Sequence, residues 1–279
     1  MPKPTFPLLI FACIPLCACQ TPTSTPVPAP TPSPPTVFIE PQEQSTFPTP
    51  PTNLRVWDVK NADVSKIDTN RKLLAFTYDD APASTLESVM AVFLAYNESN
   101  PDCVATATLF CNGFRIDEHV SNTLRTALAL GFELGNHTYS HADLSKCTAD
   151  EITCEIDKTD RILQRFDHNP RHLFRAPYGK ITDQVRSQVQ TPIIDWTIDT
   201  LDWTGKSADA IYDCVWSQKY AGAIVLMHDG YPNTAKAMKR LLPDLKNAGY
   251  QAVTVSQLAK IHGCKLQAGN VYIRARKQK

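Results

Sequence analysis

The feature that most constrains the fold of this chain is an alternation of short apolar runs and longer amphipathic stretches between residues 71 and 261. Runs such as LLAFTY at 73–78 are typical of strands buried on both faces, and the stretches between them are typical of helices. Alternating strands and helices favour a parallel sheet, because a helix supplies the crossover that each parallel pairing needs. With about seven such repeats, the sequence predicts an α/β fold whose sheet is closed or nearly closed into a barrel.

The predicted strands lie at 73–78, 105–111, 132–137, 173–179, 192–198, 222–228 and 251–255. The main predicted helices lie at 84–98, 119–131, 148–166, 234–250 and 256–261. Local signals support them, since Ser84 is a candidate N-cap, Gly131 a C-terminal stop, and Thr148 with Glu151 a capping box. We expect the folded domain to span residues 53–265, with a short basic tail at 266–279.

Residues 1–19 predict an export signal that does not belong to the fold. A single Lys precedes a short apolar stretch, which Pro7 and Pro15 interrupt and which is too short to cross about 30 Å of hydrocarbon as a regular helix. The stretch ends in Leu-Cys-Ala-Cys, which resembles the lipobox of bacterial lipoproteins and would make Cys19 the lipidated residue. The alternative is ordinary signal cleavage. We therefore expect an exported protein, either a cell-envelope lipoprotein anchored to a membrane or a secreted protein.

A Pro/Thr/Ser-rich segment follows at residues 20–52, and 15 of the 22 prolines of the chain lie in its first 52 residues. Such a composition cannot form a core and favours an extended backbone, so we expect a disordered tether between anchor and domain. The formal net charge is zero, which gives no electrostatic reason to expect a nucleic-acid partner. We expect a monomer.

Six of the nine cysteines lie in the predicted domain, and an even number in an exported domain predicts disulfide bonds. Six cysteines allow fifteen pairings. We expect Cys103 to pair with Cys111, Cys147 with Cys154, and Cys214 with Cys264. Buried free thiols are the alternative, and the absence of a CxxC spacing makes a zinc–cysteine site a weaker one.

Ionisable side chains lie at or beyond the ends of several predicted strands, with one, Arg175, inside the fourth strand. In parallel α/β barrels these strand ends form the single rim where chemistry takes place. These side chains are Asp79, Asp80, His137, His141, Arg175, Asp202 and His228. Each has a simpler explanation by itself, because Asp, Pro and Gly are common in the turns that end strands. Their coincidence at one rim favours a functional site.

The adjacent acids Asp79 and Asp80 need either a cation or different protonation states to lie close together. The sequence HTYSH places His137 and His141 four residues apart, so that both imidazoles can reach one ion. Two His and one Asp leave coordination positions open for water and substrate, as in catalytic sites for zinc or a similar divalent ion. We expect Asp80 to be the third ligand, with zinc favoured and cobalt, nickel or manganese also compatible. Asp79 then stays available as a base.

Three further segments supply a cation, a proton donor and its partner. Arg175 in RAPYG can hold a neighbouring carboxylate, and His228 in LMHDG is placed to donate a proton. Asp202 in TLDWTG can orient that imidazole, with Trp203 as an apolar wall.

Together, FTYDD, HTYSH, RAPYG, the DW at 202–203 and the LMH at 226–228 resemble the five ordered motifs of polysaccharide deacetylases, the NodB-homology or carbohydrate esterase family 4 fold. The resemblance covers roughly residues 71–261. It implies a distorted (β/α) barrel that removes acetyl groups from N-acetylated or O-acetylated glycans with the help of a divalent metal ion.

The resemblance also implies roles for individual residues. Asp79 would be the general base, with Arg175 orienting it, and Asp80, His137 and His141 would be the metal ligands.

For the remaining motifs the resemblance makes His228 the general acid and Asp202 the residue that tunes it. The backbone N–H of Tyr178 would bind the oxyanion, and Trp203 and Leu226 would line the pocket for the acetyl methyl group.

The sequence departs from the family pattern at Tyr78, Ala81 and Ala142, where Phe, Gly and Pro are usual. Ala81 is the departure that matters most, because Ala lacks the conformational freedom of Gly. No catalytic position is missing.

We expect an N-deacetylase of peptidoglycan N-acetylglucosamine, since an anchored enzyme would meet peptidoglycan first. An acetylxylan esterase and a deacetylase of chitin or chitooligosaccharides are alternatives, because the same site can cleave amides and esters. A non-catalytic carbohydrate-binding lipoprotein and a purely structural lipoprotein are alternatives of other classes.

Overall fold

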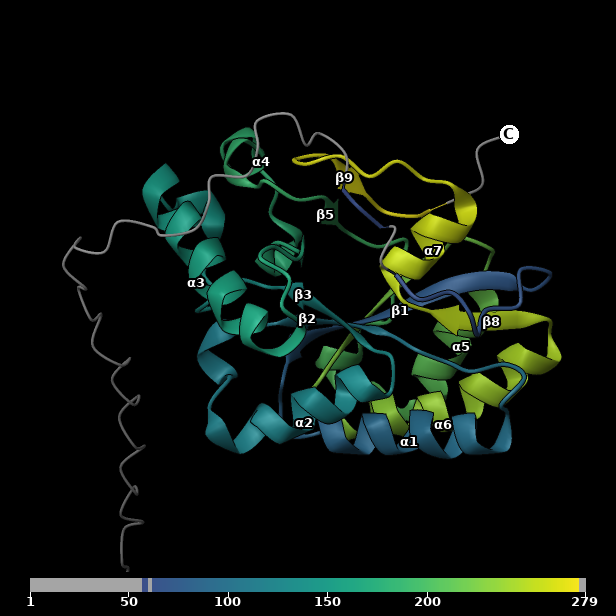
Figure 1. Ribbon diagram of the computed structural model, residues 1–279. Helices are drawn as coiled ribbons and strands as arrows, with labels where there is room; N and C mark the ends of the chain where they lie inside the picture. Colours follow the sequence, from purple (N-terminus) through teal and green to yellow (C-terminus); the bar gives the residue numbers. More distant parts are fainter. Residues whose placement is uncertain (1–56, 60–61, 276–279) are drawn as a thin grey trace, which may run out of the picture. The chain divides into compact units, whose positions relative to one another are not determined.

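A computed structural model describes residues 57–59 and 62–275 of the chain (Figure 1). The expected signal, the candidate lipidation residue Cys19 and the tether at 20–52 lie outside these residues. The described strands are β1 (Lys72–Ala81), β2 (Thr108–Cys111), β3 (Glu133–Asn136), β4 (Leu173–Phe174), β5 (Ile193–Ile194), β6 (Ile198–Asp199), β7 (Ile224–His228), β8 (Tyr250–Val253) and β9 (Val271–Tyr272).

The described α-helices are α1 (Leu86–Ser99), α2 (Glu118–Ala129), α3 (Ala149–Asp167), α4 (Asp183–Gln188), α5 (Ala208–Gln218), α6 (Pro232–Asn247) and α7 (Val255–His262). Four 3₁₀ turns follow strand ends or precede helices: η1 (Gly113–Arg115), η2 (Leu144–Lys146), η3 (Pro177–Gly179) and η4 (Asp202–Thr204). None of the helices in this part of the chain is both long and apolar enough to cross a membrane.

The strands form one sheet in the order β6-β7-β1-β2-β3-β4-β5-β9, and β8 also pairs with β1. Every strand pair is parallel, so the carboxyl ends lie along one edge. An antiparallel bridge between Ala223, just before β7, and Arg274, just after β9, links the two sides of the sheet. The result is the predicted distorted (β/α) barrel, with nine strands, several of them only two residues long, in place of about seven.

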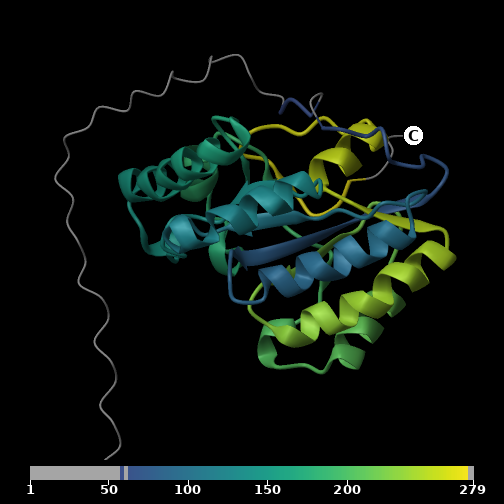
Figure 2. The same ribbon diagram turned by 60° about the horizontal axis from the view of Figure 1, so that its bottom comes forward.

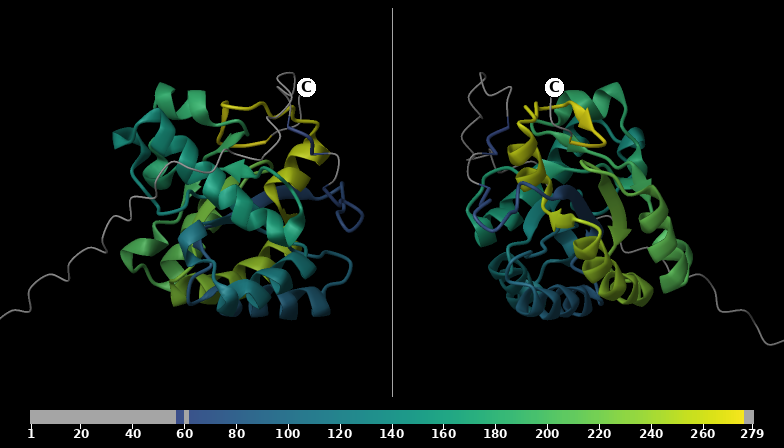
Figure 3. Two further views of the ribbon diagram at one scale, coloured as in Figure 1. Left: turned by 60° about the vertical axis from the view of Figure 1, so that its left-hand side comes forward. Right: turned by 90° about the vertical axis from the view of Figure 1, so that its right-hand side faces the viewer.

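Strand β1 shows how the alternation of side chains builds both layers of the core. Leu74, Phe76 and Tyr78 point to the layer covered by α1, α2 and α6, while Leu73 and Ala75 point inward, where α7 packs. Figure 1 shows α1, α2 and α6 on one side of the sheet and α7 on the other, and Figure 2 shows α1 and α6 side by side. Figure 3 shows the same arrangement of helices and sheet from two further sides. The inward row continues to Thr77 and Asp79, and so leads into the site.

Several boundaries differ from the predictions. The expected strand 192–198 is divided into β5 and β6, and the expected strand 173–179 keeps only its first two residues before η3. The N-cap of α1 is Thr85 rather than Ser84, whereas the capping box of α3 is present as predicted.

The segment predicted as a short basic tail is folded in large part. β9 pairs with β5, and Leu266 and Ala275 are only 1% and 3% exposed. The domain therefore extends at least to Ala275, because the apolar side chains in this stretch enter the core between its basic residues.

The three predicted disulfides are not formed, and the described cysteines are thiols. Cys103 and Cys111 direct their sulfur atoms to different backbone oxygens, those of Tyr250 (3.8 Å) and Leu109 (3.6 Å). Cys154 is exposed on α3, while Cys147 lies before that helix and contacts Asp143.

Candidate active site

Asp79 lies at the end of the inward row of β1, where the sheet presents it to Arg175 just after β4. Its Oδ1 accepts a hydrogen bond from Arg175 Nη1 at 2.7 Å, and Arg175 is 1% exposed. Arg175 also donates to Thr77 Oγ1 (2.7 Å) and to the carbonyl of Ile194 (2.9 Å), so its position is fixed. Burial acts to raise the pKa of Asp79, but the charges of Arg175, His137 and His228 outweigh it and hold that pKa below its ordinary value. Asp79 is therefore an ionised proton acceptor in a buried place.

The backbone conformation of Asp80 explains how two adjacent carboxylates are accommodated on one strand. In a regular strand Asp80 would point away from Asp79, into the layer beneath α1. Its backbone instead has φ +64°, and the pairing of β1 with β2 is irregular between Tyr78 and Ala81. This turn brings Asp80 Oδ1 to 3.5 Å from His141 Nε2. Ala81 is not among the residues with positive φ, so the strain that favours Gly falls on Asp80 instead.

Asp80, His137 and His141 form a group that can hold a metal ion, since one ligand atom from each lies within 4.8 Å of the others. His137 Nδ1 lies 2.9 Å from the carbonyl of Arg175, which can only accept, so Nδ1 carries a proton and Nε2 is the ring nitrogen that could bind a metal ion. Burial first, and the neighbouring His137 second, lower the pKa of His141, which favours the neutral imidazole that a metal requires. The donor set of two imidazoles and a carboxylate therefore fits a divalent ion.

His228 closes β7 on the other side of β1, in register with Asp79. Its Nδ1 is 2.8 Å from Asp202 Oδ1, and its backbone N–H donates to Asp202 Oδ2 at 2.9 Å. Burial acts to lower the pKa of His228, but the bond to Asp202 and the charges of Asp79 and Asp80 raise it overall. The raised pKa favours the protonated imidazole, and because Asp202 holds Nδ1, Nε2 is the nitrogen placed to donate a proton.

Three more predicted residues lie at this rim. Tyr178 in η3 has φ +61° and a side chain that is 63% exposed, with its ring 4.7 Å from that of His141. Trp203 in η4 is 52% exposed, and Leu226 in β7 is 3% exposed. The rim therefore offers exposed aromatic surface beside the ionisable groups.

Sequence reasoning missed residues that support the site. Thr234 on α6 donates to Asp202 Oδ2 at 2.6 Å, and both are buried. Asp229 accepts from the N–H of Ala83 (2.5 Å) and the hydroxyl of Thr85 (2.7 Å), which ties the end of β7 to the turn after β1. The position of Asp229 directly after His228 was a usable signal; nothing in the sequence marks Thr234.

Asp195 was also missed; it lies inside the predicted strand 192–198, and in the structure it directly follows β5. Its carbonyl accepts from Arg175 Nη2 at 3.2 Å, and its carboxylate Oδ1 is buried without a hydrogen-bond partner among the described residues. Burial raises the pKa of Asp195.

The fold and the site together define an α/β-barrel protein with a candidate metal centre and acid–base groups at the carboxyl ends of its strands, the layout of hydrolytic enzymes. Comparison with known proteins identifies the family. Residues 66–191 match the family model described as polysaccharide deacetylase. A peptidoglycan-N-acetylglucosamine deacetylase of Bacillus cereus is 32% identical over 219 residues, which are 75% of this chain and 95% of that protein. The chain belongs to the polysaccharide deacetylase family.

A second relative is matched over less than half of its length. The peptidoglycan-N-acetylmuramic acid deacetylase PdaC of Bacillus subtilis is 33% identical over 196 residues, which are 70% of this chain but 40% of that protein. The chain thus spans less than half the length of this curated relative. Among solved structures, a family 4 acetyl xylan esterase from Clostridium thermocellum in complex with a cobalt ion has a TM-score of 0.66 and 25% identity, and the match covers 73% of this chain and 98% of that one.

Proposed function

We propose that the protein is a metal-dependent deacetylase that removes acetyl groups from an N-acetylated glycan, with N-acetylglucosamine of peptidoglycan as its substrate. The observation that carries the proposal is the meeting at one rim of three units. These are the Asp79–Arg175 pair, the group of Asp80 with two imidazoles, and the His228–Asp202 pair. Amide hydrolysis needs a base for water, an electrophile for the carbonyl and an acid for the leaving nitrogen, and each unit suits one of these tasks.

The residues of the chain act as follows. Asp79, kept ionised by Arg175, takes a proton from the attacking water. The backbone N–H of Tyr178 donates to the oxygen on which negative charge develops. His228, protonated and fixed through Nδ1 by Asp202, donates its Nε2 proton to the departing amine. A divalent ion held by Asp80, His137 and His141, with zinc favoured, supplies Lewis acidity toward the acetyl carbonyl and lowers the pKa of water.

One line of support concerns the substrate. A peptidoglycan-N-acetylglucosamine deacetylase of Bacillus cereus matches this chain over 95% of its own length.

We further propose that the protein is exported and that Cys19 carries a lipid, which would hold the domain beside the cell wall through the Pro-rich tether. Two measurements test the anchor separately from the activity. We expect globomycin, an inhibitor of the lipoprotein signal peptidase, to block processing of the wild-type protein, and we expect the Cys19→Ser protein to lose its lipid attachment.

An acetylxylan esterase is the second candidate, because a structural relative is an acetyl xylan esterase and a curated relative from Pseudobutyrivibrio xylanivorans is a bifunctional xylanase/deacetylase. Its site would need an ester as substrate, with His228 protonating an alkoxide in place of an amine. Retention of both the base and the acid disfavours a non-catalytic carbohydrate-binding protein.

The decisive experiment measures acetate release from peptidoglycan, chitooligosaccharide and acetylxylan, with and without a chelator. We expect release from peptidoglycan that stops on chelation and returns with added zinc. Release that is insensitive to chelator would refute the metal-dependent mechanism, and release from acetylxylan alone would select the second candidate.

A further inference from the structure

A cavity of about 780 Å³ lies at the end of the sheet opposite the candidate active site. Its wall includes Glu133 and Leu173, which begin β3 and β4, whereas the catalytic rim follows the other ends of these strands. The volume falls in the range of about 300–1,000 Å³ that small-ligand sites occupy. We call it the amino-end cavity.

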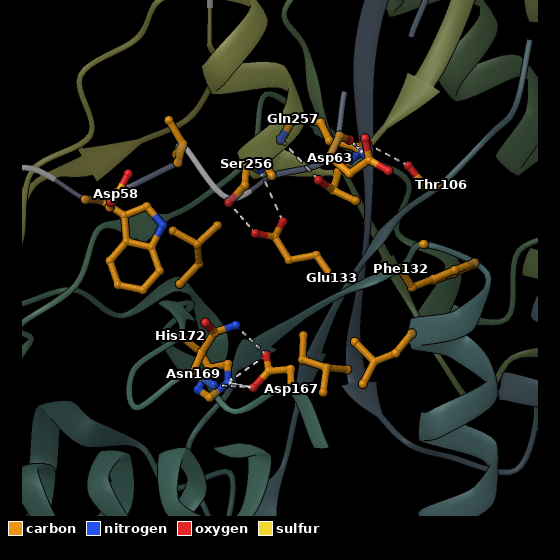
Figure 4. Close-up of a pocket in the computed structure, with 18 of the residues that line it drawn as sticks. Asp58, Asp63, Thr106, Phe132, Glu133, Asp167, Asn169, His172, Ser256 and Gln257 are labelled. Carbon is orange, nitrogen blue, oxygen red and sulfur yellow. Dashed lines mark hydrogen bonds and ion pairs between the residues drawn. The ribbon is translucent and has the colours of Figure 1, made fainter. Parts of the chain in front are cut away.

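The lining of the amino-end cavity combines an aromatic ring with planar polar side chains. Trp57 supplies the ring, and Glu133, Asn169 and Gln257 are among the polar groups. Phe132 also borders the cavity, but its ring packs against Phe93 in the core. A pyranose ring has apolar C–H faces and a periphery of hydroxyl groups, so it needs both kinds of surface. Figure 4 shows Glu133 between two polar groups, one with Ser256 and Gln257 and the other with Asp167, Asn169 and His172.

The polar groups of the amino-end cavity are held in place before any ligand arrives. Glu133 accepts hydrogen bonds from Thr108 Oγ1 (2.8 Å) and from both the backbone N–H (3.2 Å) and the hydroxyl of Ser256. These bonds place its carboxylate at the amino end of α7, which explains why an acid is tolerated there. They use three of about four acceptor positions on the carboxylate and leave one for a ligand hydroxyl. Asp167 is likewise fixed by His172 at 3.2 Å.

We propose that the amino-end cavity is a second carbohydrate site, which binds a neutral acetamido-sugar chain independently of the catalytic rim. The two sites lie at opposite ends of β3, which is four residues long and spans roughly 10 Å. A sugar in the cavity therefore does not block the rim. Binding at the cavity holds the enzyme on a polymer and raises the effective concentration of its other chains at the rim. The site therefore affects polymeric substrates and leaves small ones unaffected.

The test compares the Trp57→Ala protein with a matched control, Trp216→Ala, which removes an indole stacked on Tyr212 away from the cavity. Binding of a soluble N-acetylchitooligosaccharide is measured by calorimetry in an Asp79→Asn background, so that no turnover interferes. We expect a second binding event per chain in the background and control proteins, and its loss with Trp57→Ala. In the active protein, Trp57→Ala should raise KM on insoluble glycan by about tenfold and leave kcat/KM on a small acetylated sugar unchanged.

Trp57 also packs against the core, so a second variant guards against misfolding. Ala268→Trp fills the amino-end cavity without removing any of its contacts and should abolish the same binding event. A single binding event in the background protein, as when other residues of the chain fill the cavity, would overturn the proposal. So would unchanged binding in both variants. Because binding is measured without turnover, a failure to release acetate would contradict the proposed function alone.

Discussion

Replacement of His172 by Gln should remove a pH-dependent part of the stability of the domain. His172 is 2% exposed, and it lies between two carboxylates, with Nδ1 at 2.9 Å from Asp160 and Nε2 at 3.2 Å from Asp167. Burial acts to lower the pKa of His172, but the two carboxylates raise it to about 9. Asp160 also accepts from Asn136 Nδ2 at 2.9 Å. Asn136 Oδ1 in turn accepts from the backbone N–H of Thr138, which directly follows the candidate metal ligand His137. The buried charges thus support the loop that carries His137 and His141.

The sign and size of this effect on the free energy of unfolding follow from the linkage between proton binding and folding. A pKa that is raised on folding stabilises the protein fully below the ordinary value of about 6.5, and this stability is lost as the pH rises through about 9. The difference between the pKa of His172 in the folded protein and its ordinary pKa corresponds to about 3 kcal/mol. We therefore expect the gap in the free energy of unfolding between wild type and His172→Gln to shrink by about 3 kcal/mol from pH 6 to pH 10.

Urea denaturation of both proteins across this pH range measures the gap, and other titrating groups cancel in the difference. His119→Gln, which changes an exposed imidazole on α2, is the matched control and should follow wild type at every pH. A gap for His172→Gln that stays constant with pH would refute the assignment of a charged, doubly paired imidazole.

Four further predictions concern the candidate active site. Asp79→Asn should lower acetate release by about 10²–10⁴-fold while the protein still binds metal, as metal analysis after dialysis would report; undiminished turnover would contradict the role of base. His141→Ala should weaken zinc binding by at least about tenfold, measured by competition with a chelator, and equal affinity would remove it from the ligand set. Asp202→Asn should move the alkaline limb of the pH–rate profile to lower pH, because Asp202 raises the pKa of His228 and a general acid acts only while protonated; an unmoved limb would argue for another acid. Thr234→Val should cost about 1–3 kcal/mol in urea denaturation, because it leaves a buried carboxylate oxygen with one donor fewer, and a neutral change would show that this bond is dispensable.

The sequence by itself determined the fold class and the set of residues at the rim. Alternating apolar and amphipathic segments specify parallel strands joined by helices, and the carboxyl ends of parallel strands must lie along one edge. That rule is local and periodic, so it can be read without coordinates. It brings the acids at the end of β1 and the imidazoles after β3 to the same edge as His228.

Only the tertiary structure decided how neighbouring side chains are turned and which distant groups support them. The left-handed backbone at Asp80 sends it toward His141, although the alternation of β1 would point it the other way. Thr234 reaches Asp202 from a helix 32 residues further along the chain. The expected disulfides and the tail were wrong for a related reason, since both depend on which surfaces pack together. Contacts of this kind are fixed by packing across long sequence separations, and no spacing in the sequence encodes them.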